Sequence, residues 1–375
     1  MDYLPQRSAA ALGLIALSTR LFFAITIDLP QLLNAGWLCA LAACALTLPL
    51  ALCLGFLQQR WAAPPASKCT GIPARIFCGA LCLFSLHDLC CVMRFFTLSA
   101  SHTLLEDVRP WLLTLLLAAC ALLGCLAGVR AVGGAARVGL WVIGLMLAIT
   151  VLVQLTALNP GWLAPLLGPG LPVLARPLPH LAGLMTGLTG LWLMGDGKAG
   201  KAFSPPALVG YIALAAGGLL ALWSMLAPMM TGVPDTRLFY FDRLLTNGRV
   251  TASLQLVLLL AWYGGMLTMM SFSTVCSARL LTLTVPPLPW PWAVCLCVLG
   301  ALGATALSLA DRQVIQWINL VRWVLVTLPI LGASLFLAMR RKGESPARPE
   351  ANPSPVSPDP AAEPARLAGK RRPVP

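Results

Sequence analysis

Charged side chains are scarce in this sequence. They make up 10% of its 375 residues, whereas a soluble globular protein carries about 25%. Hydrophobic residues make up 58%, and the mean hydropathy is +0.82. This composition excludes a soluble enzyme, a disordered chain and a collagen-like fibre, and it favours an all-α polytopic membrane protein embedded in a lipid bilayer.

Acidic residues and histidines are rarer still. There are 13 Asp and Glu against 26 Lys and Arg, and only 3 His. The 13 cysteines lie mostly inside apolar runs, without metal-ligand spacing, which predicts packing residues. The sequence has no nucleophile–base pair, phosphate loop or other catalytic motif. We therefore expect no enzyme activity, no cofactor, no metal site and no nucleic-acid partner, and we attribute the net charge of +13 to membrane topology and anionic lipid.

Long apolar stretches of ~20 residues, the length that crosses a bilayer, recur along the chain. They predict ten transmembrane helices at residues 9–28, 36–58, 74–98, 110–128, 137–157, 178–195, 206–229, 250–275, 287–309 and 316–339. Most Lys and Arg, including Arg279 between spans eight and nine, then fall on one side together with both termini. This bias predicts cytoplasmic N and C termini. Residues 1–342 form the predicted permease domain, and the Pro-rich, basic residues 343–375 a disordered cytoplasmic tail.

Polar or glycine-rich breaks interrupt two predicted spans. Ser18, Thr19 and Arg20 lie near the middle of span one. Span six contains Gly183 and then, in one cluster, Thr186, Gly187, Thr189 and Gly190. Breaks that lie five spans apart are expected of a five-plus-five inverted repeat, in which unwound backbone binds a substrate at mid-membrane. Close helix packing at small residues is the alternative explanation for span six.

Span three carries a second polar cluster. His87, Cys91 and Arg94 share one helix face, and Asp88 lies about 100° from His87 on the next flank. A charge at mid-membrane costs ~2.5–3.5 kcal/mol, and Arg20 lies at a similar depth to Asp88, so we expect the two to pair. One interpretation places this pair beside a ligand cavity, with Arg20 binding a carboxylate and His87 or Asp88 carrying a coupling proton. The other is a structural ion pair that only fixes helix packing.

The remaining polar residues of the spans give weaker predictions. Arg322 lies in the outer third of predicted span ten, where its side chain is expected to extend toward the interface. Ser and Thr residues of span eight either line a cavity or bond to helix carbonyls; they are Thr268, Ser271, Ser273 and Thr274. Trp residues cluster near predicted span ends, as in an interfacial belt; they include Trp111, Trp292 and Trp317.

Several phrases, in this order, resemble one family of permeases. They are Asn34-Ala35-Gly36-Trp37-Leu38, Arg94 with Leu104 and Arg109-Pro110, Gly128 to Gly134 with Arg137, Leu163-Ala164-Pro165-Leu166-Leu167-Gly168-Pro169-Gly170-Leu171-Pro172, and Gly248-Arg249. Over about residues 6–342 the chain resembles the spore-germination permeases, the B subunits of germinant receptors, in the amino acid–polyamine–organocation superfamily. It departs from them at Arg20, where small residues are usual, and at Thr189, where glutamate is frequent.

The resemblance implies a LeuT-like fold with broken helices one and six. It also implies a multi-pass protein, in the inner membrane of a spore or in a cell membrane, that senses an amino acid or similar small germinant together with other germinant-receptor subunits. In this role a bound ligand shifts the helix bundle between states. The alternative is a proton-coupled amino acid transporter that works by alternating access. The expected binding residues are Ser18, Thr19, Arg20, Asp88, Thr186, Gly187, Thr189 and Gly190, with His87, Asp88 and Arg94 in proton coupling or gating.

Overall fold

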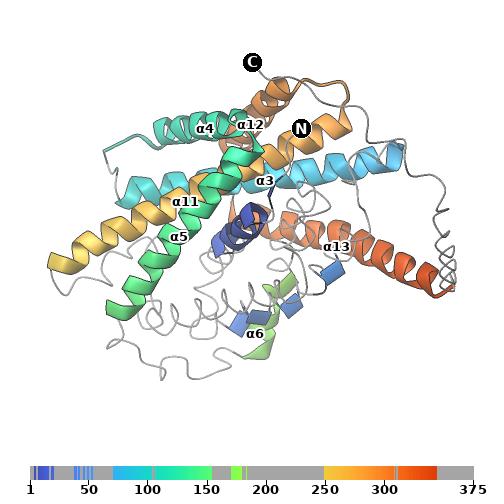
Figure 1. Cartoon of the computed structure of the whole chain (residues 1–375), viewed down its shortest axis with the longest axis horizontal. Helices are drawn as coiled ribbons and strands as arrows, with labels where there is room; N and C mark the ends of the chain where they lie inside the picture. The colour runs from blue at the N-terminus through green and yellow to red at the C-terminus, as the bar shows by residue number, and fades with distance from the viewer. Residues whose placement is uncertain are drawn as a thin grey trace, which may run out of the picture. The chain divides into compact units, whose positions relative to one another are not determined.

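A computed structural model describes part of the chain, in which every regular element is a helix (Figure 1). The described residues are 4, 5, 7–16, 18–20, single positions between 38 and 53, 71–103, 105, 107–153, 170–179, 183, 249–307, 309 and 311–343. By compactness the chain divides into two units, Met1–Ser334 and Leu335–Pro375. Of the second unit, the structure describes only residues 335–343, the end of a helix that begins in the first.

Seven helices have defined bounds, and residues 7–16 and 18–20 are helical as well. The seven are α3 (Ile72–Thr103), α4 (Pro110–Leu126), α5 (Val129–Val153), α6 (Leu171–Ala175), α11 (Arg249–Thr284), α12 (Trp290–Ala306) and α13 (Arg312–Gly343). Prolines in the first turn start α4, α6 and α12, where the missing N–H has no partner to lose. The segment of predicted span two is described only at single positions, and that of span seven lies outside the described residues.

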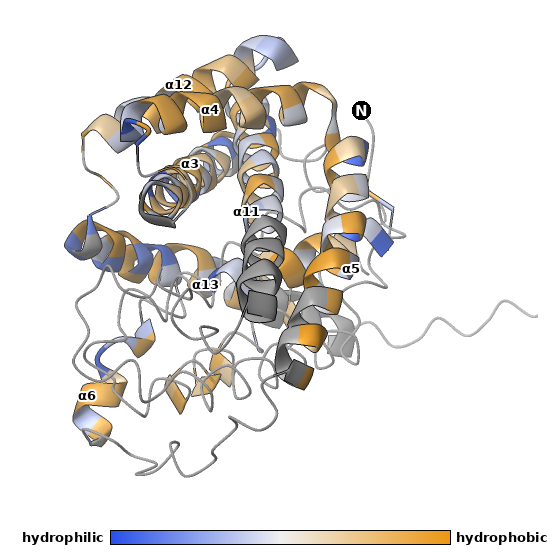
Figure 2. Ribbon diagram, turned by 90° about the vertical axis from the view of Figure 1, so that its left-hand side faces the viewer, coloured by the Kyte–Doolittle hydropathy of each residue, from blue (hydrophilic) through white to orange (hydrophobic). Residues whose placement is uncertain are grey.

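Three described helices are long and apolar enough to cross a membrane. Their apolar stretches are Arg75–Ser101 in α3, Tyr263–Thr284 in α11 and Gln313–Ala333 in α13. A fourth candidate is α4 with the first part of α5, which meet at a 114° bend. In Figure 2, α4 is mostly hydrophobic, whereas hydrophobic and hydrophilic residues alternate along α13. The described part of the chain therefore has three or four candidate membrane spans, and the helical class predicted from composition is confirmed to that extent.

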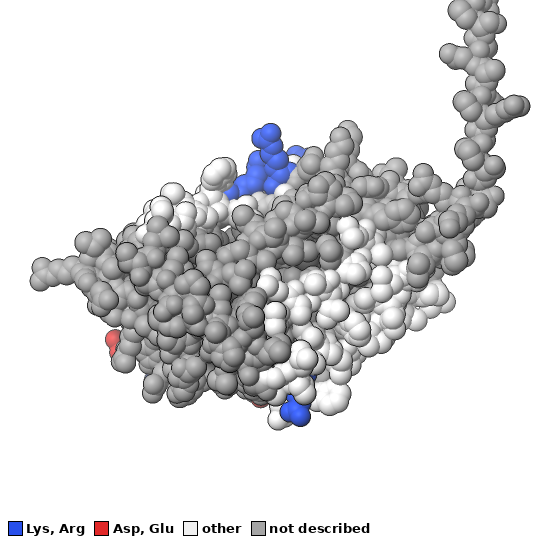
Figure 3. Space-filling model, turned by 90° about the horizontal axis from the view of Figure 1, so that it is seen from below, with Lys and Arg blue, Asp and Glu red and all other residues white. Residues whose placement is uncertain are grey.

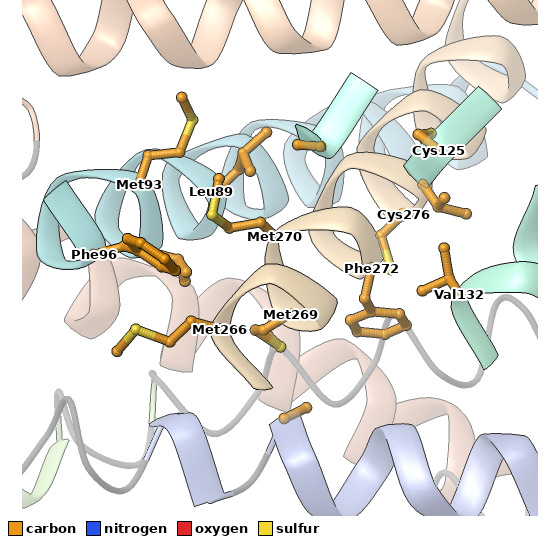
Figure 4. Close-up of a cluster of buried hydrophobic side chains, with 14 of the residues drawn as sticks. Leu89, Met93, Phe96, Cys125, Val132, Met266, Met269, Met270, Phe272 and Cys276 are labelled. Atoms are coloured by element: carbon orange, nitrogen blue, oxygen red, sulfur yellow. The ribbon is translucent and has the colours of Figure 1, made fainter. Parts of the chain in front are cut away.

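The core of the described part is built around α11. In its apolar stretch 72% of the residues are buried, compared with 50% for α3 and 33% for α13. Close packing joins α11 to α3, α5, α12 and α4. Figure 4 shows methionines, Phe272 and Cys276 of α11 among side chains of α3, α4 and α5. α11 thus occupies the centre of the described part, and its neighbour α3 contains Asp88.

Large apolar side chains are exposed on the outer helices, as a surface in contact with lipid requires. Leu116 and Leu123 of α4, Trp141 of α5 and Leu299 of α12 are each at least 60% exposed. Trp111, Trp292 and Trp317 lie in the first two turns of their helices and are also exposed, in agreement with an interfacial belt. On the face shown in Figure 3, the described surface is mostly uncharged, with basic side chains in separate places.

Two helix ends differ from their predicted positions by more than two helical turns. α5 begins at Val129 rather than at 137, because Gly128 alone makes the turn with φ of +94°. α11 continues to Thr284 rather than ending at 275. The prediction of Arg279 in an inner loop is therefore wrong: it lies within α11 and is 6% exposed. In both segments arginines and small residues led to a loop prediction, whereas the helix is continuous.

Candidate functional site

A single carboxylate links three helical segments in the core. Asp88 of α3 accepts a hydrogen bond from Nη2 of Arg20 at Oδ2, at 2.7 Å, and one from Nη1 of Arg322 at Oδ1, at 2.6 Å. The three side chains are 7%, 4% and 1% exposed, respectively. The predicted pair of Arg20 and Asp88 is therefore present, and we call the three residues together the charge cluster. Its formal charge is +1, because two guanidinium groups share one carboxylate.

Arg322 makes a backbone hydrogen bond and a cation–π contact in addition to its ion pair with Asp88. Besides Asp88, its guanidinium donates from Nη2 to the backbone oxygen of Phe84 at 2.6 Å, and it lies 5.2 Å from the centre of the Phe84 ring. Such a cation–π contact is strongest where water is excluded. Its Nε–H has no hydrogen-bond partner within the described part of the chain. The prediction that Arg322 extends toward the interface is wrong: it is buried in the core.

The charge cluster lies halfway along two candidate spans. Asp88 is the central residue of Arg75–Ser101, and Arg322 is next to the centre of Gln313–Ala333. An isolated charge at this depth is costly, and breaking a buried pair by removing one partner costs about 3–5 kcal/mol. Burying the charges of the cluster therefore costs free energy. Such buried charges are typical of residues that bind a ligand or define a conformation.

The predicted break in span one is not at the residues proposed for it. Ser18, Thr19 and Arg20 are themselves helical. Thr19 is buried, Ser18 is half-buried, and Arg20 reaches Asp88 from a helical backbone. Their side chains are therefore accommodated by packing and by the ion pair, without local unwinding. Residues 21–37 lie outside the described residues.

His87 ties the middle of α3 to the connection between α12 and α13. Its Nε2 lies 3.2 Å from the backbone oxygen of Leu309, and Cys91 Sγ lies 3.5 Å from the same nitrogen. Hydrogen bonding to a carbonyl requires the proton on Nε2. His87 thus neighbours the charge cluster in sequence, and its side chain binds the segment that leads into α13.

Arg94 binds the same connection, about two turns further along α3 than His87. Its Nη2 lies 2.9 Å from Oδ1 of Asp311, and the two side chains are 34% and 52% exposed. Together with the His87 contact, this ion pair holds Leu309 and Asp311 against the second half of α3. Arg94, which was predicted to share a site with Asp88, therefore forms a separate and much more exposed ion pair.

We expect Arg94→Ala and Asp311→Ala to change stability little, by less than about 1 kcal/mol, because solvent screens a half-exposed pair. The measurement is thermal unfolding of each variant in detergent. A large loss of stability in either variant would show that this contact is not a surface pair of the ordinary kind.

The predicted break in span six is described at one position only. At Gly183 a Cβ atom would overlap the carbonyl group of Asn319 in α13. Glycine is required for so close an approach of two backbones, which supports the close-packing explanation at this residue. The other candidates, Thr186, Gly187, Thr189 and Gly190, lie outside the described residues. The contact shows that this segment meets α13 within one turn of Arg322.

Asn319 was not predicted from the sequence as a candidate site residue. Buried residues recur along one face of α13 at helical spacing: Ile315, Asn319, Arg322, Val326 and Ile330. Asn319 is 1% exposed, and neither Oδ1 nor Nδ2 of its amide has a hydrogen-bond partner within the described part of the chain. An unpaired buried polar group costs ~1–3 kcal/mol. The spacing of Asn319 and Arg322 on the apolar stripe is the signal that identifies this face in the sequence.

Of the four polar residues singled out in predicted span eight, two bond within their own helix, α11. The hydroxyls of Thr268 and Thr274 donate to the carbonyls of Gly264 and Met270, four residues earlier. Ser271 packs against Gly124 of α4, where a Cβ atom would lie 2.6 Å from its Oγ. Ser273 is buried, and its Oγ has no hydrogen-bond partner in the described residues. Of the two alternatives predicted for these residues, bonding to helix carbonyls is the one observed at Thr268 and Thr274.

The cysteines of the described residues are thiols rather than disulfides, and most of them are buried. Within this part of the chain, no group of three or more His, Cys, Asp or Glu side chains is arranged to hold a metal ion. Cys82 of α3 donates to the backbone oxygen of Ser277 in α11, at 3.3 Å. At Cys82 the thiol thus joins two packed helices.

The chain was compared with models of protein families and with curated proteins. No family model matches it, and no curated protein matches it.

Proposed function

We propose that this chain is a permease-like membrane protein that binds a small carboxylate-bearing molecule, such as an amino acid, at the charge cluster. The observation that carries the proposal is the sharing of Asp88 between two buried guanidinium groups. Arginine is well suited to this role, because its planar fork matches the geometry of a carboxylate. A ligand carboxylate beside Arg20 or Arg322 would supply the negative charge that the cluster lacks.

The physiological role that we propose is that of a germinant-receptor subunit in a spore or cell membrane. It rests on the phrases that resemble the spore-germination permeases. A ten-span inverted-repeat fold and assembly with other receptor subunits are part of the same proposal. In this role the charge cluster connects ligand binding to the relative positions of span one, α3 and α13, since each contributes one of its charges. A bound carboxylate that competes with Asp88 for a guanidinium would shift these helices between two states.

The second candidate function is proton-coupled amino acid transport, which His87 favours. Both oxygens of Asp88 accept hydrogen bonds from arginine, so that protonation of Asp88 would remove at least one of them. His87 is the better proton carrier of the two, because it binds the connection to α13 through a single ring nitrogen. Co-purification of other germination proteins from detergent would favour the receptor, and proton-dependent uptake into proteoliposomes would favour the transporter.

We expect at least one amino acid to raise the melting temperature of the purified full-length protein, because a ligand that binds the folded state stabilises it. Each of the twenty amino acids is tested in detergent with the wild type, with Arg20→Ala and with Arg94→Ala. The shift should be lost in Arg20→Ala, which still leaves Asp88 bound to Arg322. It should persist in Arg94→Ala, which removes the same kind of side chain outside the cluster.

A shift that survives in Arg20→Ala would place amino acid binding elsewhere in the molecule. The absence of a shift with every amino acid, for wild-type protein that elutes as a single species and unfolds cooperatively, would contradict the proposal.

A further inference from the structure

The amide of Asn319 is the feature of the core that the charge cluster does not explain. It is buried on the inner face of α13, three residues before Arg322, which places the two side chains about 60° apart around the helix and one turn apart along it. Buried amides in proteins are hydrogen-bonded as a rule. Both amide atoms of Asn319 and the Nε of Arg322 have no partner within the described part of the chain. One turn of α13 thus presents donors and an acceptor to which none of the described residues bonds.

We propose that Asn319 is a ligand-binding residue of the same site, and that the ligand is an α-amino acid in its zwitterionic form. The inference rests on the proposed function. The amide offers an N–H donor for a carboxylate and an oxygen acceptor for an ammonium group, and a zwitterion needs both. A simple carboxylate would use only the donor, and a simple amine would gain nothing from the neighbouring guanidinium groups.

Asn319 also takes part in a close backbone contact, with Gly183. The backbone of Asn319 is where the segment of predicted span six meets α13. A ligand held by the Asn319 side chain would therefore bind at a point where three parts of the chain converge: α13, the segment at Gly183 and, through Arg322 and Asp88, α3. This convergence makes Asn319 a residue that determines which ligands are accepted.

The test uses Asn319→Leu, which replaces the amide with an apolar side chain of similar size. Because no described residue bonds to the wild-type amide, the melting temperature of this variant without ligand should equal or exceed that of the wild type. The dissociation constant for the amino acid that shifts the wild type most should rise by about tenfold or more. Asn319→Ala, which leaves space and no polar group, should show the same loss of affinity.

Thr327→Val is the matched control. Thr327 is also buried in α13, and its hydroxyl lacks a hydrogen-bond partner in the described residues. It lies more than one turn beyond Arg322, so that its replacement should leave the affinity within about twofold of the wild type. The ligand class is tested with the deaminated and decarboxylated analogues of the same amino acid, and both should bind the wild type more weakly than the amino acid does.

Three outcomes would overturn the inference. Unchanged affinity in Asn319→Leu and Asn319→Ala, with binding intact in the wild type, would overturn it alone and leave the proposed function standing. A lower melting temperature of both variants without ligand would identify Asn319 as a structural residue. The absence of amino acid binding by the folded wild type would overturn the proposed function and this inference with it.

Discussion

Replacing Asp88 with asparagine is expected to be the most damaging single change in the charge cluster. It removes the carboxylate that Arg20 and Arg322 both bind, and it leaves two positive charges close together in the core, halfway along two candidate membrane spans. Breaking a buried pair in this way costs about 3–5 kcal/mol. We expect Asp88→Asn to be poorly folded, with a melting temperature in detergent far below that of the wild type.

The companion variants follow from the charges of the cluster. Arg322→Gln leaves one arginine facing one carboxylate and should be less destabilised than Asp88→Asn. The double variant Asp88→Asn/Arg322→Gln restores the formal charge of +1 and should be less destabilised than the two single variants predict by addition, since residues in one ion-pair network are coupled. Strict additivity in this double-mutant cycle, or a stable Asp88→Asn protein, would contradict the arrangement of the cluster.

Two of the three residues of the charge cluster could be predicted from the sequence. Arg20 and Asp88 are opposite charges at similar depth in two predicted spans, and the cost of burying either one makes pairing the simplest expectation. Arg322 was misplaced because the predicted span 316–339 put it near one end. The apolar stretch of α13 is Gln313–Ala333, which puts Arg322 at the middle. An error of a few residues in the predicted span boundaries was thus enough to place Arg322 at the interface instead of in the core.

The remaining differences have a common physical cause. Arg279 and the arginine-rich start of α5 were assigned to loops by composition, whereas helix continuity depends on the backbone and on where each side chain can be accommodated. Asn319 carries no charge and forms no motif, and only the buried stripe on α13 reveals it. The helical class and most of the described helices followed from apolar length alone, but the choice between a ligand site and a structural pair depends on which buried groups lack partners.

The contact at Gly183 gives the second large expected effect. A methyl group at this position would overlap the carbonyl of Asn319, and backbone cannot rotate away as a flexible side chain can. We expect Gly183→Ala to push α13 away from this segment, with a loss of about 1–3 kcal/mol or more in stability and a lower melting temperature in detergent.

Gly332→Ala in α13 is the matched control, because a Cβ there meets no atom within 4 Å. The control should be neutral or slightly stabilised by its higher helix propensity. Because Asn319 and Arg322 share one turn of the helix, amino acid binding should weaken in Gly183→Ala even at temperatures where the variant remains folded. Equal melting temperatures and equal affinities for the two variants would show that Gly183 does not hold this crossing together.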